Sequence, residues 1–195
     1  MKKIRCTWCG DDPLYLAYHD NEWGVPVYDD QTLFEFLILE TFQAGLSWIT
    51  ILKKRENFRK AFDNFDYKKI GAYSDDKIAS LLQDTGIIRN KLKVNAAVTN
   101  AHFFMEIQKE FGSFSIYIWR FVNKKPIKNS YKTQAELLAN TPLSDKISAD
   151  LKNRGFKFVG TTFVYAYMQA IGIVNNHVES CFRYLDIPKS ISGDL

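Results

Sequence analysis

The sequence lacks any apolar run of the roughly 18 residues that a membrane-spanning helix requires, so we expect no membrane segment. It contains only three cysteines, an odd number that argues against a disulfide framework and favours a reducing, cytoplasmic setting. The first residues are basic but lead into a polar stretch, and a secretory signal peptide is therefore not expected.

Extended strands and long linkers are also missing from the pattern. No segment alternates apolar and polar residues with a period of two, and the 5 prolines and 10 glycines separate helical patterns instead of forming linkers. We predict an all-α fold, with residues 1–185 as one domain that can divide into two helical halves around a cleft, and residues 186–195 as a C-terminal tail. The predicted helices span residues 14–20, 30–43, 48–62, 77–83, 88–111, 114–121, 143–153 and 163–171, with a last helical turn through 181.

Aromatic side chains and a mild positive charge are the main features of the composition. Phe, Tyr and Trp make up 15% of the residues, which leaves rings to line a site for a flat ligand after the core is built. The net charge is +4, and this balance permits a polyanionic partner without requiring one.

Two pairs of metal-binding residue types lie near opposite ends of the chain. His177 and Cys181 are four positions apart, the spacing that places two ligands on one face of a helix. Cys6 and His19 form the second pair, although Cys9 could take the place of Cys6. Two cysteines and two histidines make a closed set suited to structural zinc, which would join the two ends of the chain. The alternative is that these are unrelated core and surface residues.

A tight turn at Gly86 is predicted to join two helices within residues 81–93. Such a turn exposes backbone N–H groups at a helix N-terminus, where a phosphate binds well. Arg89, Lys91 and Lys93 follow in the first turns of the second helix and can neutralise neighbouring phosphates. The alternative is a helical corner with a solvated basic face. A second basic cluster, at 53–60, is interpreted as solvated surface.

Glu40 is a lone carboxylate in the apolar run at 37–42, where burial is costly unless it finds hydrogen-bond donors. Those donors belong either to the backbone or to a ligand. Aromatic rings lie on both sides of it in the sequence, and rings with one buried acid are typical of a pocket for a flat, electron-poor heterocycle. Taken singly, each ring could equally be part of the core. The rings are Trp8, Tyr15, Tyr18, Trp23 and Trp48.

Five motifs together resemble one protein family. They are DPLYLAYHDNEWGVP at 12–26, QAGLSWIT at 43–50, KKREN at 53–57, GIIR at 86–89 and RGFKFVGTT at 154–162. From about residue 6 to residue 181, in order and without large gaps, the chain resembles the 3-methyladenine DNA glycosylase I family. The resemblance implies a helix–hairpin–helix DNA glycosylase fold with one structural zinc per chain.

The resemblance also assigns roles to individual residues. It implies that Glu40 is the base-recognition acid, that Trp48 and Tyr18 stack on the base, and that Gly45 and Leu46 push into the DNA stack. Trp8, Tyr15 and Trp23 fall on further pocket-lining positions. The family's zinc ligands fall on Cys6 in preference to Cys9, and on His19, His177 and Cys181.

The implied activity is base-excision repair of double-stranded DNA that contains alkylated bases. The enzyme would flip 3-methyladenine out of the duplex, hydrolyse its N-glycosidic bond and leave an abasic site. No Asp lies between Gly86 and Phe121, where many related glycosylases carry a catalytic one, which favours a monofunctional enzyme without lyase activity. We expect a monomer. A zinc-bearing DNA-binding module without catalysis, and a helical protein-interaction domain, are the two rival hypotheses.

Overall fold

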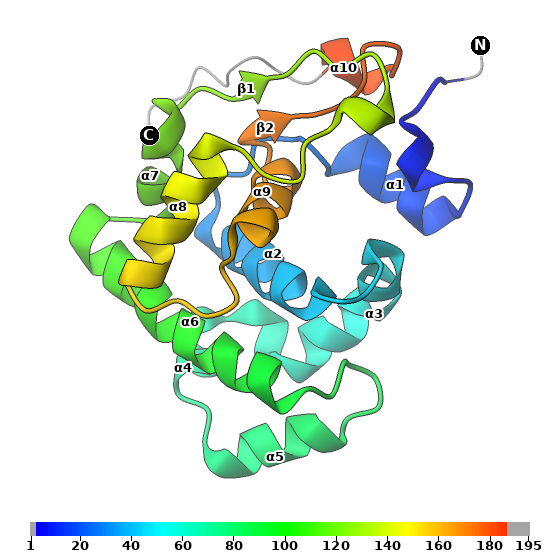
Figure 1. The fold of residues 1–195 in the computed structure, drawn as a ribbon. Helices are drawn as coiled ribbons and strands as arrows, with labels where there is room; N and C mark the ends of the chain where they lie inside the picture. Colours follow the sequence, from blue (N-terminus) through cyan, green and yellow to red (C-terminus); the bar gives the residue numbers. More distant parts are fainter. Residues whose placement is uncertain (1–2, 187–195) are drawn as a thin grey trace.

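The computed structural model describes residues 3–186 and is built almost entirely of helices (Figure 1). The α-helices are α1 (Pro13–Asn21), α2 (Asp30–Gln43), α3 (Trp48–Ala61), α4 (Tyr67–Gly71), α5 (Asp75–Gln83), α6 (Lys91–Phe111), α7 (Phe114–Trp119), α8 (Pro142–Asn153), α9 (Thr161–Ala170) and α10 (Arg183–Asp186). Four short 3₁₀ helices are η1 (Thr7–Cys9), η2 (Asp63–Phe65), η3 (Arg120–Val122) and η4 (Gln134–Glu136). The prediction of a helical fold is confirmed.

Capping residues explain why the helices begin where the sequence predicts. The Asp12 side chain accepts a hydrogen bond from the Leu14 amide, and Pro13 occupies the first helical position of α1. Thr141 and Ser144 form a reciprocal capping box at the start of α8. These local signals set the helix boundaries before any tertiary contact is considered.

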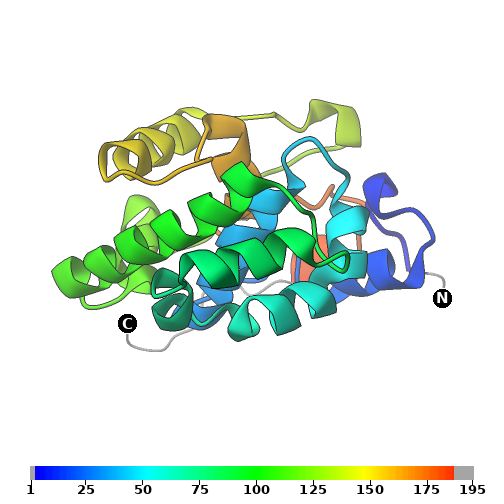
Figure 2. The same ribbon diagram turned by 90° about the horizontal axis from the view of Figure 1, so that it is seen from below.

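Helix α2 lies at the centre of the molecule, with α3, α6, α7 and α9 packed around it (Figure 1). All ten residues from Leu33 to Phe42 are buried, as expected for a helix that is apolar on every side. Seen from below in Figure 2, α4, α5 and α6 cover one side of this centre. Within residues 3–186 no helix is both long and apolar enough to cross a bilayer.

Several boundaries differ from the prediction. Helix α6 begins at Lys91 instead of residue 88, because Asn90 caps it. The short helix α4 was not predicted, and neither was the pair of two-residue parallel strands β1 (Ile127–Lys128) and β2 (Val174–Asn175), which are too short to show a period. Of the predicted tail at 186–195, only Asp186 lies among the described residues, at the end of α10.

The segment from His177 to Cys181 is not helical, and the prediction of a helical turn there is wrong. It follows β2 as an irregular stretch, closed by a turn in which the Cys181 amide donates to the Val178 carbonyl at 2.8 Å. The next residue, Phe182, donates its amide to the Ile4 carbonyl at 2.9 Å. Backbone pairing therefore brings the N-terminal segment and the C-terminal segment side by side.

Candidate functional site

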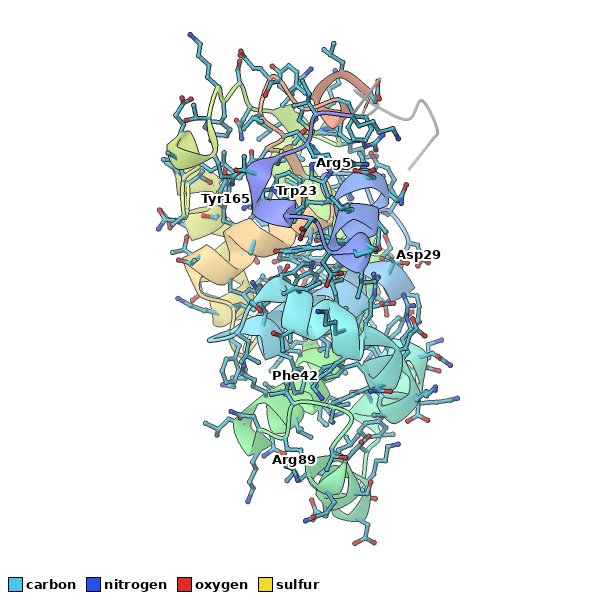
Figure 3. All side chains as sticks on the ribbon, turned by 90° about the vertical axis from the view of Figure 1, so that its right-hand side faces the viewer. Arg5, Trp23, Asp29, Phe42, Arg89 and Tyr165 are labelled. Atoms are coloured by element: carbon cyan, nitrogen blue, oxygen red, sulfur yellow. The ribbon has the colours of Figure 1, made fainter. Side chains whose placement is uncertain are left out.

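Glu40 and all five predicted rings line one cavity of about 190 Å³. Trp8 comes from η1, Tyr15 and Tyr18 from α1, and Trp48 from the first position of α3. Trp23 closes the upper part of this region, while Phe42 on α2 lies further down (Figure 3). The cavity is completed by residues that sequence analysis missed: Gln43, Gln134, Leu137, Ala166 and Gln169.

The rings contact one another around the cavity. The centroid of Trp8 lies 5.0 Å from that of Tyr15 and 4.8 Å from that of Trp23, both edge to face. The centroids of Tyr18 and Trp48 are 5.3 Å apart. These contacts hold the rings in place, so a flat ligand would meet aromatic surfaces that are already ordered.

Glu40 is 5% exposed, and none of the residues 3–186 donates a hydrogen bond to its carboxyl group. Burial raises its pKa to about 8. The alternative that backbone donors satisfy this carboxyl is therefore wrong. A cationic or proton-donating ligand in the cavity would stabilise the ionised form.

Three more polar atoms of the cavity are buried without a hydrogen-bond partner among the described residues: Trp8 Nε1, Trp48 Nε1 and Gln134 Oε1. Buried polar atoms in folded proteins are nearly always paired, because an unpaired one costs about 1–3 kcal/mol. Two donors and one acceptor on residues that line the same cavity are therefore available to a polar ligand.

A second buried cluster lies next to the aromatic rings of the cavity and contains three of the four predicted metal ligands. The ligand atoms of Cys6, His19 and Cys181 all lie within 4.8 Å of one another. His177 stands beside this triplet, with its ring centroid 4.9 Å from that of His19. Cys9 is also buried, but it is not part of the triplet, and its thiol donates to the Cys6 carbonyl at 3.0 Å.

Both histidines are oriented by their Nδ1 atoms. Nδ1 of His19 lies 2.9 Å from the Asp20 carboxylate, whose pKa Arg5 lowers to about 2, and Nδ1 of His177 lies 2.9 Å from the Asn175 side-chain oxygen. In this orientation the Nε2 atoms carry the lone pairs. Nε2 of His177 is buried and has no partner among residues 3–186. Histidine ligands with one ring nitrogen anchored this way are typical of metal sites.

The two thiols of the cluster influence each other's ionisation. Cys6 and His19 lower the pKa of Cys181, whereas Cys181 and burial raise the pKa of Cys6. The Cys181 sulfur also lies 3.5 Å from Nε2 of His19. Two cysteine sulfurs and two imidazole nitrogens are a donor set that zinc prefers.

The loop 84–90 joins α5 to α6 and turns toward α3 (Figure 2). The Lys54 ammonium donates to the carbonyls of Thr85 and Gly86 at 3.2 and 3.1 Å. The Gly86 amide donates to the Asp84 carboxylate at 2.7 Å. The Gly86 amide is therefore engaged within the loop, and the amides of this loop that no described group accepts from are those of Thr85, Ile88 and Arg89.

Arg89 and Lys91 are exposed and have no ion-pair partner among the described residues, as a phosphate contact would require. Lys93 is different. It is 5% exposed, and its ammonium donates to the carbonyls of Phe42 and Ala44 at 2.9 and 2.6 Å. The prediction that Lys93 meets a phosphate is wrong, because this side chain caps the C-terminal end of α2 instead.

Gly45 and Leu46 form the turn between α2 and α3, at the edge of the cavity. Gly45 has a φ of +84°, and Leu46 is 40% exposed. An exposed leucine on a turn anchored at both ends by helices can reach outward from the protein. In Figure 3 Arg89 lies toward the lower end of the molecule, below Phe42.

The basic cluster at 53–60 is not a uniform solvated face. The Arg55 side chain is 11% exposed and donates to Glu35 and Glu22, each at 2.6 Å. Arg59 joins the same network through Glu35 at 2.8 Å. This network ties α3 to α2 and to the end of α1, and so supports the helices that carry the cavity.

Comparisons with known proteins agree with this arrangement. A family model described as Methyladenine glycosylase matches residues 8–184. DNA-3-methyladenine glycosylase 1 of Escherichia coli K12 is 49% identical over 180 residues, which cover 92% of this chain and 96% of that protein. A 3-methyladenine DNA glycosylase I variant solved in complex with 3-methyladenine has a TM-score of 0.90 at 35% identity, covering 96% of this chain and 99% of that one. The enzyme of Staphylococcus aureus has a TM-score of 0.87 at 35% identity, covering 97% and 98%.

The helical fold is that of a DNA glycosylase. The chain belongs to the methyladenine glycosylase family.

Proposed function

We propose that this glycosylase hydrolyses the N-glycosidic bond of 3-methyladenine in alkylated DNA, releasing the free base and leaving an abasic site. The observation that carries the proposal is the Glu40 carboxyl, buried among ordered rings without a donor of its own. A relative of nearly the same fold has been solved in complex with 3-methyladenine. That base fits the needs of the cavity, since it is flat, carries an exocyclic amine and is cationic while still joined to DNA.

Excision requires the base to leave the helical stack, because the glycosidic bond is not accessible inside a duplex. In this proposal Trp48 and Tyr18 stack on the flipped base, and Glu40 accepts a hydrogen bond from its amino edge. A cation over aromatic faces is attracted by their quadrupoles. Unmodified adenine lacks the charge, so it gains less from the rings and from Glu40.

Alkylation at N3 already makes the base a good leaving group, so selective binding does most of what catalysis needs. Contacts that tighten as the bond breaks lower the barrier. With a pKa of about 8, Glu40 is largely protonated at neutral pH while the cavity is empty. Arrival of the cationic base favours its ionised form, which couples recognition to charge.

For DNA binding we propose that α5, the loop 84–90 and α6 act as a helix–hairpin–helix element. Its phosphate contacts would be Arg89, Lys91 and the free amides beside them. Leu46 would fill the gap that the flipped nucleotide leaves in the stack. These contacts hold the duplex in register and do not read the lesion.

For the metal cluster we propose one structural zinc held by Cys6, His19, His177 and Cys181. The unpartnered Nε2 of His177 and the proximity of the ligand atoms of Cys6, His19 and Cys181 support this donor set. When bound, the metal would supply a crosslink between the two ends of the chain. Four protein ligands leave no position for a reacting water.

We also propose that the enzyme is monofunctional. Residues 86–121 contain no Asp, and the buried Lys93 is occupied by two carbonyls, so it is not free to attack a sugar carbon. Water is then the nucleophile, and strand cleavage is not expected.

The test is a base-release assay on DNA alkylated at several positions, with strand breaks scored on the same samples. We expect release of 3-methyladenine and intact strands until the abasic site is cleaved by alkali. DNA binding without release would support the rival DNA-binding module, and neither binding nor release would support the interaction domain. Strand cleavage without alkali would overturn the monofunctional assignment.

A further inference from the structure

Gln134 reaches the cavity from a part of the chain where the sequence shows no helical pattern. It begins η4, between β1 and α8. The carboxylate of Glu136 holds this turn by accepting from the Lys132 amide at 3.0 Å and from the Thr133 hydroxyl at 3.1 Å. The preceding Tyr131 carbonyl accepts from the Glu179 amide at 2.9 Å. The turn that carries Gln134 is thus held by the Glu136 side chain, and the chain just before it is tied to the C-terminal segment.

The side-chain oxygen of Gln134 is buried and has no donor among the described residues. It lines the same cavity as Glu40, but Gln134 comes from η4 and Glu40 from α2. The cavity therefore offers a base two acceptors from two separate elements, and it leaves both without a protein donor.

An exocyclic amine has two N–H groups, and one carboxylate contact uses only one of them. We propose that Gln134 Oε1 accepts the second N–H, so that Gln134 is a specificity-determining residue that selects 6-amino purines over 6-oxo purines. This inference rests on the function proposed above. An oxo group at the same position would set one oxygen against another and leave the buried Gln134 oxygen unpaired, which costs free energy. The two acceptors together then recognise the amine of the base, whereas the rings recognise its flat surface and its charge.

The experiment is a double-mutant cycle between the protein side chain and the amine. Binding of free 3-methyladenine and of 3-methylpurine, which lacks the amine, is measured by calorimetry for the wild type and for Gln134→Leu. We expect Gln134→Leu to weaken 3-methyladenine binding by about three- to tenfold and to change 3-methylpurine binding by less than about twofold. Gln169→Leu makes the same change on α9, at a glutamine whose amide is not a buried unpaired group, and it should affect both bases alike.

Equal effects of Gln134→Leu on both bases, or no effect on either, would overturn the inference, as would an amine-dependent effect in Gln169→Leu alone. Base release by the wild type separates this outcome from failure of the proposed function. If the wild type does not release 3-methyladenine, the function is wrong. If it does and the cycle shows no coupling, only the role of Gln134 is wrong. Thermal unfolding of Gln134→Leu should match the wild type, because the side chain contributes no hydrogen bond inside the protein.

Discussion

The cavity and the metal cluster are adjacent buried polar regions that differ in how far hydrogen bonds orient their polar side chains. They share a wall of rings, since Trp8 lies 5.4 Å from the His19 ring and Trp23 lies 4.5 Å from the His177 ring, centroid to centroid. In the cluster, each histidine is anchored at Nδ1 by a neighbouring oxygen, and the open atom is Nε2 of His177, which faces no partner among the described residues. In the cavity, Glu40 and the indole nitrogens have no partner among the described residues.

On the functions proposed above, the difference separates a permanent occupant, the zinc, from a transient one, the base. A site that always holds its metal can orient each ligand side chain through hydrogen bonds to atoms that do not face the metal. A site that must bind and release a base keeps its contacts open and loses stability while it is empty. The predictions that follow change one region and ask whether the other is affected.

Removing the metal from the cluster is expected to have the largest effect, and the effect is on stability. His177→Ala, or treatment with a strong chelator, should lower the free energy of unfolding by about 3 kcal/mol or more, because metal binding is coupled to folding. Metal analysis should find one zinc per chain in the wild type. In the folded fraction of the variant, base release should change much less than stability does.

Cys9→Ala is the matched control, since Cys9 is buried close to the cluster but lies outside the ligand triplet. It should keep its zinc. If protein purified without chelator contained no zinc, the assignment of the cluster would be wrong. If Cys9→Ala lost its zinc, Cys9 would have to be one of the ligands.

Because Glu40 is buried in the empty cavity, the free energy of unfolding should depend on pH. In the folded protein the Glu40 pKa is about 8, against an ordinary 4.5, so the folded state holds a proton that the unfolded chain releases between those values. The contribution of Glu40 to stability therefore falls as pH rises from about 5 to about 8 and is constant above. Urea unfolding should show that the free energy of unfolding of Glu40→Gln increases relative to that of the wild type across this pH range. At its upper end the change in this difference should be on the order of 3 kcal/mol. A constant difference between the two proteins would mean that Glu40 is not buried as described.

The same substitution should have the opposite effect on activity. Glu40→Gln should lose about tenfold to a hundredfold in kcat/KM for 3-methyladenine release, since one charged acceptor to a cationic base is lost. The wild-type kcat/KM should rise with pH up to about 8 as the free-enzyme carboxyl ionises, and the variant should lack this rise.

Glu35→Gln provides the contrast on the same helix. Glu35 is also buried, but it is bound to Arg55 and Arg59. This change should destabilise the protein and leave the chemistry of its folded fraction nearly intact. A stable Glu40→Gln protein with wild-type rates would remove Glu40 from the site.

The cavity was largely predictable from the sequence because its residues differ in character from their neighbours in the chain. Glu40 is conspicuous as an acid in an apolar helix, and the rings around it are too numerous for the core alone. Gln134 carried no such signal, because its polarity is ordinary for a loop and only the tertiary fold turns it inward. The helix starts were predictable because caps such as Asp12 act within a few residues.

The errors came from side-chain direction, which the sequence does not contain. Lys93 has the same charge as Arg89 and Lys91 and stands near them in the chain, yet it faces the end of α2. The turn at Gly86 was expected to expose backbone N–H groups, and the sequence does not show that Asp84, two residues earlier, accepts the amide of Gly86 itself. The segment from His177 to Cys181 has helical spacing of its ligands, although a turn is what brings Cys181 toward His19.

Lys93→Met tests this corrected role by separating positioning from phosphate binding. Loss of the ammonium leaves the Phe42 and Ala44 carbonyls without their donor, and it also removes a positive charge from the C-terminal end of α2. The expected cost is about 1–2 kcal/mol of stability by urea unfolding. The slope of DNA affinity against salt should stay at the wild-type value, because no phosphate contact is lost. A slope reduced by about one unit would restore Lys93 to the DNA surface.

Substitutions in the hairpin of α5, the loop 84–90 and α6 should have the smallest effect. They should change the affinity for damaged and intact DNA equally. Arg89 and Lys91 are exposed, unpaired among the described residues and close to the free amides of the loop 84–90, so their expected contacts are phosphates. Phosphates are identical beside damaged and intact bases, and contacts to them carry no information about the lesion. The Arg89→Ala, Lys91→Ala double variant should bind damaged and undamaged duplexes about tenfold more weakly by the same factor, with a salt slope lower by about two units. Calorimetric binding of free 3-methyladenine should equal that of the wild type, since only the cavity is involved. If the double variant lost affinity for the free base while its DNA affinity and salt slope were unchanged, the hairpin would belong to base recognition, and the division between the cavity and the DNA surface would fail.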